Sequence, residues 1–521
     1  MTITAPISAP AGGAEGAGPA AVEFQNVSKR FGSVAANDGV SFTVPRGSIC
    51  GIVGENGAGK STAMKLLYGM IRPDQGRILV GGVERNWRSP AEAIAAGIGM
   101  VHQHFMLAGA LDALDNILVG AEPRRRGMLD RGGARRTVEE LSQAYGLAVD
   151  LDRPVEDLPV GVQQRVEILK LLFRRAEILI LDEPSAVLTP IEVTALFQNL
   201  ARLRAEGKTI LLITHKLREI MDFTDRVAVF RAGRVVGEMA TSTTSSQELA
   251  DLMVGRKVSL QMSASPAAPR QESALRVEAL AAGGHGGRSG LGEVSFELKQ
   301  GEILGIAGVE GNGQSELLRA ILFPSDRACR TRGRVWVLGR EVTDSQPGEI
   351  RSLGVAVIPE DRLREGILPE RPAAESFVLG RQREDSFGRW GWLDPARVRA
   401  AFQAAATQFD IRPPDPDLSA GRFSGGNQQK IVLAREFGRE PRLVIAAQPT
   451  RGVDVGAIEA IHQRIVRVRD EGAGVLLVSS ELDEILALSD RILVMFNGRF
   501  VAEFARGRVT EREIGLKMGG A

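Results

Sequence analysis

The sequence predicts an α/β fold that is built twice in one chain. Short apolar runs alternate with longer amphipathic stretches, and this alternation is typical of parallel sheets covered by helices. A glycine-rich segment that begins at Gly54 returns at Gly308 in the same setting. The chain has 521 residues, which is too many for one compact core. Two tandem domains of similar architecture therefore account for its length.

Other short segments repeat together with the glycine-rich one. A period of this length indicates duplication of a whole domain rather than a solenoid. The spacing between equivalent segments grows from 254 residues (308 − 54) to 265 (490 − 225), so the second copy gained residues in its middle. The matched segments are Val40-Ser41-Phe42 with Val294-Ser295-Phe296, Asp225-Arg226-Val227 with Asp490-Arg491-Ile492, and Gly233-Arg234 with Gly498-Arg499.

The ends of the two copies set the expected domain organisation. The first twenty residues are rich in Ala, Gly and Pro and lack the basic residues of a signal peptide. Between the copies lies a stretch of Ser, Ala, Pro and Gln with little apolar periodicity, which favours a short linker. We expect a disordered tail over residues 1–20, a first domain over 21–256, a linker over 257–273 and a second domain over 274–521.

The composition of the chain limits the kinds of partner and compartment that we expect for it. With 44% hydrophobic and 25% charged residues the chain resembles an ordinary globular protein, and its net charge of +1 gives no electrostatic reason to expect nucleic acid. Two cysteines, Cys50 and Cys329, favour a reducing compartment over a disulfide framework. No apolar run approaches the ~20 residues of a membrane helix, so we expect any membrane contact to run through a partner.

The expected elements follow the apolar periodicity of the first half. Ser48–Val53 is predicted to be a buried strand, and apolar residues at helical spacing follow Gly59. Ile178–Leu181 and Thr209–Ile213 are predicted to be further central strands. Two stretches of helical composition without strand runs, about Leu107–Asp157 and Leu363–Gly421, are predicted to form a helical subdomain inserted in each half.

The first glycine-rich segment fits the pattern G-x-x-x-x-G-K-[ST]. Glycines let backbone N–H groups converge on phosphates, and the following helix adds partial positive charge at its N-terminus. Lys60 is expected to reach the β- and γ-phosphates, and Ser61 to bind Mg²⁺. The predicted phosphate-binding residues are Gly54, Glu55, Asn56, Gly57, Ala58, Gly59, Lys60, Ser61 and Thr62.

Polar residues follow three other predicted strands of this half. Asp182 and Glu183 end one apolar run, and a carboxylate there can hold Mg²⁺ while its neighbour polarises the attacking water. Gln103 and His215 follow two further strands. The carboxyl ends of parallel strands are where ligand sites of α/β folds lie, which favours functional roles over structural ones.

These residues resemble the ATPases of the ABC transporter family over nearly the whole chain beyond Ala20. The resemblance implies two ABC-type domains that use ATP and Mg²⁺. Gly54–Ser61 is then the Walker A loop and Asp182 the Walker B aspartate, and Ser61, Gln103 and Asp182 are the expected Mg²⁺ ligands. It also makes Glu183 the catalytic base, Gln103 the Q-loop residue and His215 the switch histidine. Phe31 matches the aromatic residue that stacks on adenine, the alternative being a core phenylalanine.

The second half has lost the residues that this resemblance assigns to hydrolysis. Lys60 is replaced by Gln314, Asp182 by Ala447 and Glu183 by Gln448. Glu360 stands in place of Gln103, and Ser480 in place of His215. Such residues act as a unit, so we expect no effective cleavage here. Gly308, Gly313 and Ser315 remain, and ATP is expected to bind without being cleaved.

The signature motif of the family shows the opposite asymmetry. The second half has Ser424, Gly425, Gly426 and Asn427 at the start of a predicted helix, where a hydroxyl and bare amides can cap a γ-phosphate. The first half has Pro159, Val160 and Gly161 there, and the proline removes both the hydroxyl and a backbone donor. Asp454 keeps the D-loop acid, which Thr189 replaces in the first half.

In the ABC family two such domains pair head to tail, and each ATP lies between the Walker residues of one and the signature of the other. The resemblance therefore implies one hydrolytic composite site, from the first Walker set and the second signature. The degenerate residues Gly308, Gly313, Gln314, Ser315, Pro159 and Gly161 then share the other site.

A fused pair with an altered second half resembles the ATPases of bacterial sugar and nucleoside importers, most of all the nucleoside branch. The segments that carry this are Val101–Leu107, Gly161–Lys170 and Ala446–Gly452. It implies two multi-span permease subunits, a substrate-binding lipoprotein and a place on the cytoplasmic face of the inner membrane.

The nearest alternative to a nucleoside importer is a monosaccharide importer. A twin-ABC protein acting on ribosomes or DNA would favour two working Walker sets and a long charged linker, and a regulatory module would not need the complete set around Glu183.

Overall fold

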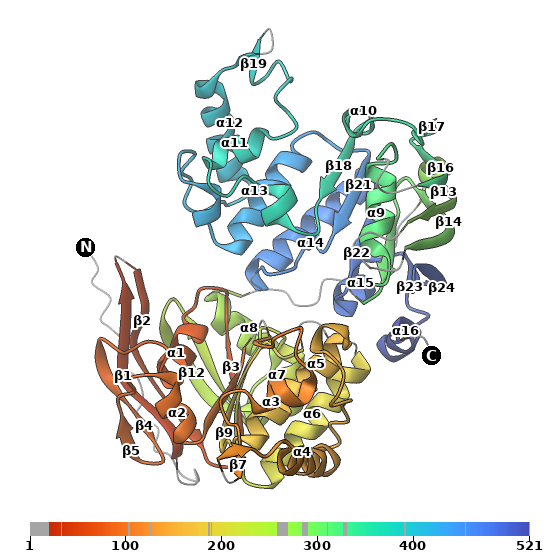
Figure 1. Ribbon diagram of the computed structural model, residues 1–521. Coiled ribbons are helices and arrows are strands. Elements are labelled where there is room, and N and C mark those ends of the chain that lie inside the picture. Colours follow the sequence, from red (N-terminus) through yellow and green to blue (C-terminus); the bar gives the residue numbers. More distant parts are fainter. Residues whose placement is uncertain are drawn as a thin grey trace, which may run out of the picture. The chain divides into compact units, whose positions relative to one another are not determined.

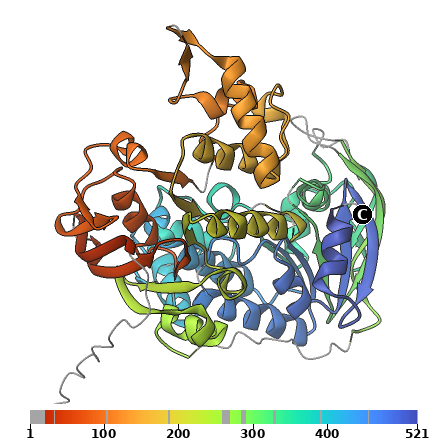
Figure 2. The same ribbon diagram turned by 90° about the horizontal axis from the view of Figure 1, so that it is seen from below.

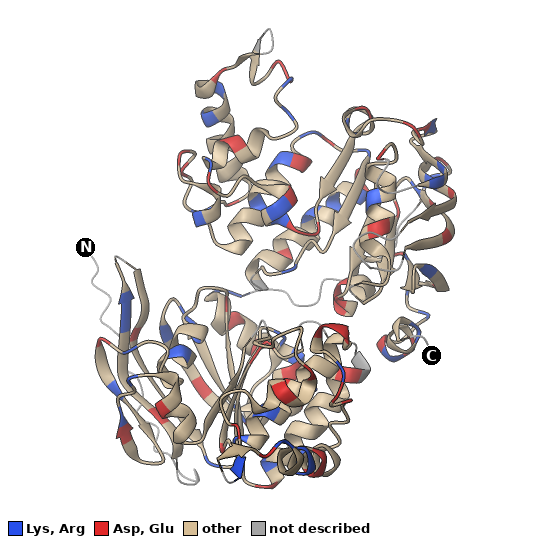
Figure 3. Cartoon of the chain, viewed as in Figure 1, with Lys and Arg blue, Asp and Glu red and all other residues tan. Residues whose placement is uncertain are grey.

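The computed structural model describes residues 20–32, 34–102, 105–125, 127–185, 188, 190–257, 269–283, 290–309, 311–326, 331–389, 392–453 and 455–519. The described chain forms two compact units, one made mainly of residues before 246 and the other mainly of residues after it (Figure 1). Residues 1–19 of the predicted disordered tail and most of the predicted linker lie outside the described residues, so the domain boundaries stay a prediction. In each unit acidic and basic side chains are interspersed (Figure 3).

The first half contains two sheets. An antiparallel sheet has the order β2-β1-β4-β5, and a six-stranded sheet has the order β12-β11-β3-β10-β9-β6. In the second sheet β3 pairs in parallel with both β10 and β11, and only β12 runs antiparallel. The strands are β1 (Ala20–Phe31), β2 (Val34–Pro45), β3 (Ile49–Gly54), β4 (Gln75–Val80), β5 (Val83–Arg85), β6 (Ile98–Val101), β9 (Ile178–Asp182), β10 (Thr209–Ile213), β11 (Arg226–Arg231) and β12 (Arg234–Ala240).

Helices cover this sheet, and a helical subdomain is inserted between β6 and β9. The helices on the sheet are α1 (Lys60–Leu67), α2 (Pro90–Ala95), α6 (Pro190–Ala205), α7 (Leu217–Phe223), η2 (Thr241–Thr243) and α8 (Ser246–Val254). The subdomain consists of α3 (Ala113–Leu118), β7 (Arg124–Arg125), β8 (Met128–Leu129), α4 (Arg131–Tyr145), η1 (Val155–Asp157) and α5 (Val160–Phe173). The subdomain with its small hairpin is orange to dark yellow in Figure 2.

The second half repeats this plan strand for strand. Its sheets have the orders β14-β13-β16-β17 and β18-β21-β22-β15-β23-β24. The strands are β13 (Ser273–Ala282), β14 (Leu291–Lys299), β15 (Ile303–Ala307), β16 (Arg332–Val337), β17 (Arg340–Glu341), β18 (Val355–Ile358), β21 (Leu443–Ala447), β22 (Gly474–Ser479), β23 (Arg491–Phe496) and β24 (Arg499–Ala505).

Its helices also correspond to those of the first half. The helices on the sheet are α9 (Gln314–Leu322), α10 (Pro347–Ser352), α14 (Val455–Asp470), α15 (Leu482–Leu488) and α16 (Glu511–Met518). The inserted region consists of η3 (Arg362–Gly366), a π-helix, followed by α11 (Ala373–Val378), β19 (Gly388–Arg389), β20 (Trp392–Leu393), α12 (Pro395–Gln408), η4 (Ala420–Arg422) and α13 (Gly425–Phe437).

The predicted α/β architecture and its buried strands are confirmed. Every residue of β3, β9 and β10 is buried, as expected for parallel strands covered on both faces. The predicted inserted segments hold helices. The structure adds to each segment a small hairpin whose strands have two residues each, which is too short to give a strand signal in the sequence. Among the described residues, no helix is long and apolar enough to cross a membrane.

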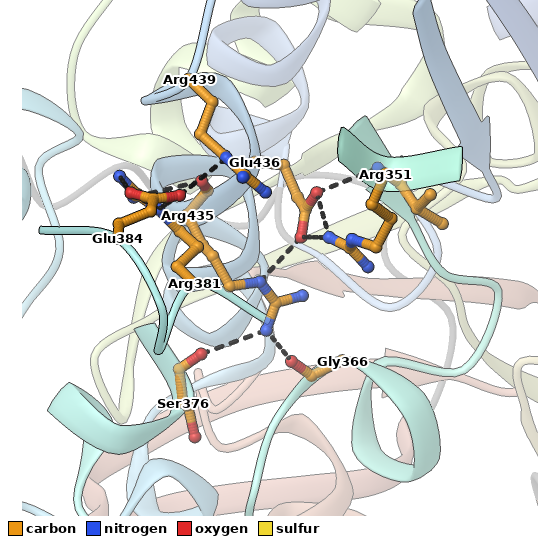
Figure 4. A network of polar contacts seen from close by, with 9 residues as sticks. Arg351, Gly366, Ser376, Arg381, Glu384, Arg435, Glu436 and Arg439 are labelled. Carbon is orange, nitrogen blue, oxygen red and sulfur yellow. Dashed lines mark hydrogen bonds and ion pairs between the residues drawn. The ribbon is translucent and has the colours of Figure 1, made fainter. Parts of the chain in front are cut away.

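A buried ion network joins α13 to β18 and to the inserted helices in the second half (Figure 4). The Glu436 carboxylate accepts hydrogen bonds from Arg351 Nη2 at 2.6 and 2.7 Å, Arg435 Nε at 2.8 Å and the Val357 N–H at 3.0 Å. Arg435 Nη1 in turn donates to the carbonyls of Gly366, at 2.6 Å, and Ser376, at 3.1 Å. The signature helix is thereby held to the segment that follows β18.

Replacing Glu436 with leucine, the residue at the equivalent position Leu171 of the first half, is expected to destabilise the second half by roughly 3–5 kcal/mol. The reason is that Arg435, 3% exposed, loses its carboxylate partner. Replacing Arg435 with leucine as well should recover part of the loss, because no buried charge then remains unpaired. Guanidinium unfolding followed by circular dichroism measures both variants.

The matched control is Glu375→Leu, which breaks the exposed pair between Glu375 and Arg371. An exposed pair contributes about 0–1 kcal/mol, so its unfolding midpoint should hardly move. Equal effects of Glu436→Leu and Glu375→Leu would contradict the importance given to the buried network.

Candidate nucleotide sites

The first phosphate loop connects β3 to α1 in a shape that needs glycine. Gly57 and Gly59 have φ angles of 80° and 100°, in the left-handed region. A Cβ atom on Gly59 would press on the Ala36 carbonyl and the Asn37 amide, and that amide donates a hydrogen bond of 3.1 Å to the Gly59 carbonyl. Glu55, Asn56 and Ala58 complete the loop, whose backbone is therefore held against neighbouring strands.

Lys60 begins α1 with its ammonium group inside this loop. The side chain is buried, and Nζ donates a hydrogen bond of 2.6 Å to the Gly54 carbonyl. Thr62 lies in the same first turn of the helix. Lys60 thus places a positive charge beside the N-terminus of α1, and both attract phosphate oxygens.

Ser61 and Asp182 form the side of the site that fits a metal ion. Asp182 ends β9, and Ser61 Oγ lies 3.4 Å from its Oδ2. Burial and the neighbouring Glu183 charge raise the pKa of Asp182 to about 6. The site thus offers a buried carboxylate beside a serine hydroxyl, and hydroxyl and carboxylate oxygens are the ligands that Mg²⁺ prefers. The residues present therefore fit Mg²⁺.

Glu183 lies between the metal side of the site and His215. Its Oε1 hydrogen-bonds to His215 Nδ1 at 3.1 Å. Burial by itself raises the pKa of Glu183, but the His215 hydrogen bond and the charges of His215, Lys60 and Lys216 outweigh it, so this pKa lies below its usual value. The carboxylate is therefore ionised at neutral pH and can accept a proton from water. Its backbone has a φ of 49°, and its N–H donates to the Ile213 carbonyl at 2.8 Å.

Three predicted site residues need separate comment. Phe31 ends β1 with 52% of its surface exposed, which removes the alternative of a core phenylalanine and leaves its ring available for stacking. Gln103 and Asp454 lie outside the described residues, so their roles stay predictions.

The second phosphate loop keeps the backbone of the first without its cation. Gly311 and Gly313 have φ angles of 92° and 108°. Gln314 begins α9 and is buried, and its amide donates to the Val309 carbonyl at 3.1 Å. The same amide fills the space where a Cβ of Gly308 would lie. A neutral side chain thus stands where Lys60 stands in the first half.

The pair formed by Glu183 and His215 is replaced in the second half by a neutral pair of the same geometry. Gln448 has a φ of 46° and donates its N–H to the Val478 carbonyl at 2.7 Å, as Glu183 does to Ile213. Its Oε1 accepts a hydrogen bond of 3.2 Å from Ser480 Oγ. The backbone that positions Glu183 has therefore been kept at Gln448, while both titratable groups have been removed.

The signature helices differ in the way the sequence predicts. Ser424 caps α13, with Oγ accepting from Asn427 Nδ2 at 2.9 Å, and Gly425 and Gly426 form the first turn. In the first half Pro159 stands at the N-cap of α5 without a side-chain hydrogen bond, followed by Val160 and Gly161. Only the second half can offer a hydroxyl group at this position.

Arg362 is a residue that the sequence analysis did not single out. Its guanidinium donates to the carbonyls of Arg451 at 2.6 Å and Gly452 at 3.1 Å, and to Gln428 Oε1 at 3.3 Å. A Cβ atom on Gly425 would press on this guanidinium and on the Gly452 carbonyl. Arg362 therefore explains why glycine begins α13, and its only signal in the sequence was a basic residue two positions after Glu360.

Comparison with known proteins agrees with this geometry. A family model described as ABC transporter matches residues 37–186 and 291–451. A nucleoside import ATP-binding protein of Lactococcus lactis is 42% identical, over 96% of this chain and 98% of that protein. A guanosine import ATP-binding protein of Bacillus subtilis is 43% identical, over 96% and 97%. A glucose import ATP-binding protein of Haloferax volcanii is also 43% identical, over 96% of each.

A solved ATP-binding cassette of an ABC transporter in its ADP conformation is 26% identical, with a TM-score of 0.41 and coverage of 46% of this chain and 96% of that one. The family model matches two regions that together make up more than half of the chain, and the relatives align over almost their full lengths. The chain therefore belongs to the ABC transporter family, as a tandem ATPase of the group that includes nucleoside and sugar importers.

Proposed function

We propose that this chain hydrolyses ATP to drive an ABC importer for nucleosides, and that one of its two nucleotide sites performs the cleavage. The observation that carries the proposal is the set of Lys60, Ser61, Asp182, Glu183 and His215 around one phosphate loop. In the second half three of these positions hold Gln314, Ala447 and Gln448, and the base and the cation are lost together.

The roles of the residues follow from their positions. Lys60 and the backbone of the loop neutralise phosphate charge, and Glu183 accepts the proton of the attacking water while His215 orients its carboxylate. Ser61 and Asp182, with Gln103 as a further predicted ligand, hold Mg²⁺, which supplies charge neutralisation for the phosphates. Phe31 stacks on the adenine.

The signature of the second half completes this site. Ser424, Gly425, Gly426 and Asn427, with Asp454 as a predicted neighbour, cap the γ-phosphate of the ATP held by the first Walker set. This is supported by the capped start of α13 and by the uncapped start of α5 after Pro159. The second Walker set and the first signature form a degenerate site that holds nucleotide.

The cargo and the partners are inferred from the relatives. Two of the relatives import nucleosides by name, at 42% and 43% identity. We infer two multi-span permease subunits and a substrate-binding lipoprotein as partners, with the chain at the cytoplasmic face of the inner membrane. A monosaccharide importer is the second candidate, because a glucose import relative is equally identical at 43%.

Replacing Glu183 with glutamine should lower steady-state ATP hydrolysis by about 10²–10⁴-fold, because the base is removed while the hydrogen-bonding shape stays. Bound ATP should persist in this variant, and phosphate release and nucleotide retention measure the two effects. Turnover within a few-fold of the parent protein would rule out Glu183 as the base.

The composite arrangement predicts unequal effects at the two signatures. Ser424→Arg should nearly abolish hydrolysis, because a large cation replaces the hydroxyl that caps the γ-phosphate. The control change Val160→Arg, at the exposed position that follows Pro159 in the first-half signature, should leave most of the hydrolysis. Equal losses in the two variants would contradict the proposed pairing.

Uptake of radiolabelled compounds in cells that lack the gene should identify the cargo. Restoring the chain should restore uptake of guanosine or adenosine, and restoring the Lys60→Ala variant should not, because ATP binding at the first phosphate loop is impaired. Uptake of ribose and glucose should be unaffected. Restored sugar uptake would instead establish the second candidate.

A further inference from the structure

The signature serine of the second half is held on both sides by one arginine. Arg362 begins the π-helix η3 and lies partly buried against the start of α13. Its Nε donates to Oε1 of Gln428 at 3.3 Å, and the Gln428 amide donates to the Phe423 carbonyl at 3.0 Å. Its Nη2 lies 2.6 Å from the place where a Cβ atom of Gly425 would be. The two residues that flank Ser424 are therefore both restrained through one guanidinium.

The same guanidinium also joins the signature to the loop that follows β21. Nη1 donates to the Arg451 carbonyl at 2.6 Å, and Nη2 donates to the Gly452 carbonyl at 3.1 Å. The Gly452 carbonyl oxygen lies 2.5 Å from the place of the same Gly425 Cβ atom, so the loop and the helix start are packed directly on each other. Each nitrogen of Arg362 thus has its own acceptor. The planar fork of arginine suits such a set of acceptors, and a lysine ammonium does not reproduce it.

The first half differs at both positions of this contact. Arg362 is the fourth residue after the end of β18, and the fourth residue after the end of β6 is Phe105. Val160 begins α5 as Gly425 begins α13. A phenyl ring donates no hydrogen bond to carbonyls, and a Cβ atom at the helix start collides with an arginine placed as in the second half. The arginine and the glycine therefore occur together, in the half whose signature keeps its serine.

Extra residues between β18 and α11 accompany the arginine. The strand ends Val101 and Ile358 are 257 positions apart (358 − 101). Ala108 and Leu368, whose N–H groups each bond to the side chain eight residues later, are 260 positions apart (368 − 108). The second half has therefore gained three residues in the segment that contains the π-helix. Such helices are rare and often occur at functional sites.

The signature requires this restraint because a cap for phosphate works only from a fixed position. The first N–H groups of a helix have no partner within the helix, so they are available to a ligand but are not held by the helix itself. Donors that stabilise charge during a reaction must be oriented before the charge develops. A displacement of about 1 Å can lower a rate by about 10²-fold. The contacts of Arg362 therefore bear on turnover as well as on the fold.

We propose that Arg362 is a positioning residue for ATP hydrolysis, which holds Ser424 and the N–H groups at the start of α13 in the orientation that caps the γ-phosphate. It acts through the signature and the loop after β21 rather than through contact with nucleotide. The inference rests on the proposed function in one respect, which is that the second signature serves the ATP bound at the first phosphate loop. It adds the residue that orients this signature, which Phe105 cannot replace in the first half.

Replacing Arg362 with lysine in the full chain tests this role, because lysine keeps the positive charge and loses the fork of donors. The kcat of steady-state ATP hydrolysis should fall by about 10–100-fold, because the cap is displaced. The KM for ATP should stay within about twofold, because Lys60 and the first phosphate loop still bind the substrate.

The matched control is Arg364→Lys. Arg364 belongs to the same π-helix, but 86% of its side chain is exposed, and its ion pair with Asp361 is long, at 3.9 Å. Because an exposed pair of this kind contributes little, kcat should stay within about twofold of the parent protein. Guanidinium unfolding of the two variants should give similar midpoints, which shows whether the lysine at 362 leaves the second half folded.

A double variant separates positioning of the signature from a general structural role. Ser424→Ala by itself should lower kcat, because the capping hydroxyl is removed. If Arg362 acts through the signature, Arg362→Lys combined with Ser424→Ala should lose less than the product of the two single losses, because groups that work as a unit are not additive.

Unchanged turnover of Arg362→Lys, with reduced turnover of Ser424→Ala, would overturn the inference alone. Losses that multiply in the double variant would also overturn it, as would a loss of turnover that follows unfolding of the second half, because Arg362 would then serve only the fold. Full turnover of Ser424→Ala would overturn it together with the proposed pairing of the first Walker set and the second signature. The two failures are therefore distinguishable.

Discussion

Parallel pairing of the strand before each phosphate loop is the constraint on which both sites depend. β3 lies between β10 and β11, and β15 lies between β22 and β23. Because parallel strands end at one edge, residues far apart in sequence meet there, as Ser61 does with Asp182 and Ser315 with Glu360. The crossover helices that this pairing requires also bury the strands on both faces.

The two halves show that backbone geometry and site chemistry have diverged separately. The left-handed residue after β9 and β21 is kept, together with its hydrogen bond to the neighbouring strand, although glutamate has become glutamine. The glycine turn is kept although lysine has become glutamine. The residues of the second site were therefore replaced without loss of the backbone shape.

The second half is also held together by charges that the first half lacks. Arg351, Arg435 and Glu436 join the signature helix to β18 and to the segment after it, where the first half has Ile94, Lys170 and Leu171. Lys170 instead donates to the Met106 carbonyl at 3.1 Å, which keeps a link between the same two elements. Both halves thus connect the signature helix to the segment that follows the edge strand, by different chemistry.

The sequence by itself determined the duplicated α/β fold, the central strands and the complete and incomplete phosphate loops, because these depend on local patterns such as apolar runs and spaced glycines. It also located Glu183 and His215 at strand ends. Only the tertiary structure decided that Arg362 lies over Gly425, that Phe31 is exposed and that Glu360 meets Ser315. Those contacts join residues that are many positions apart in the sequence, and they depend on the order of the strands in the sheet. The local sequence pattern of a segment does not determine that order.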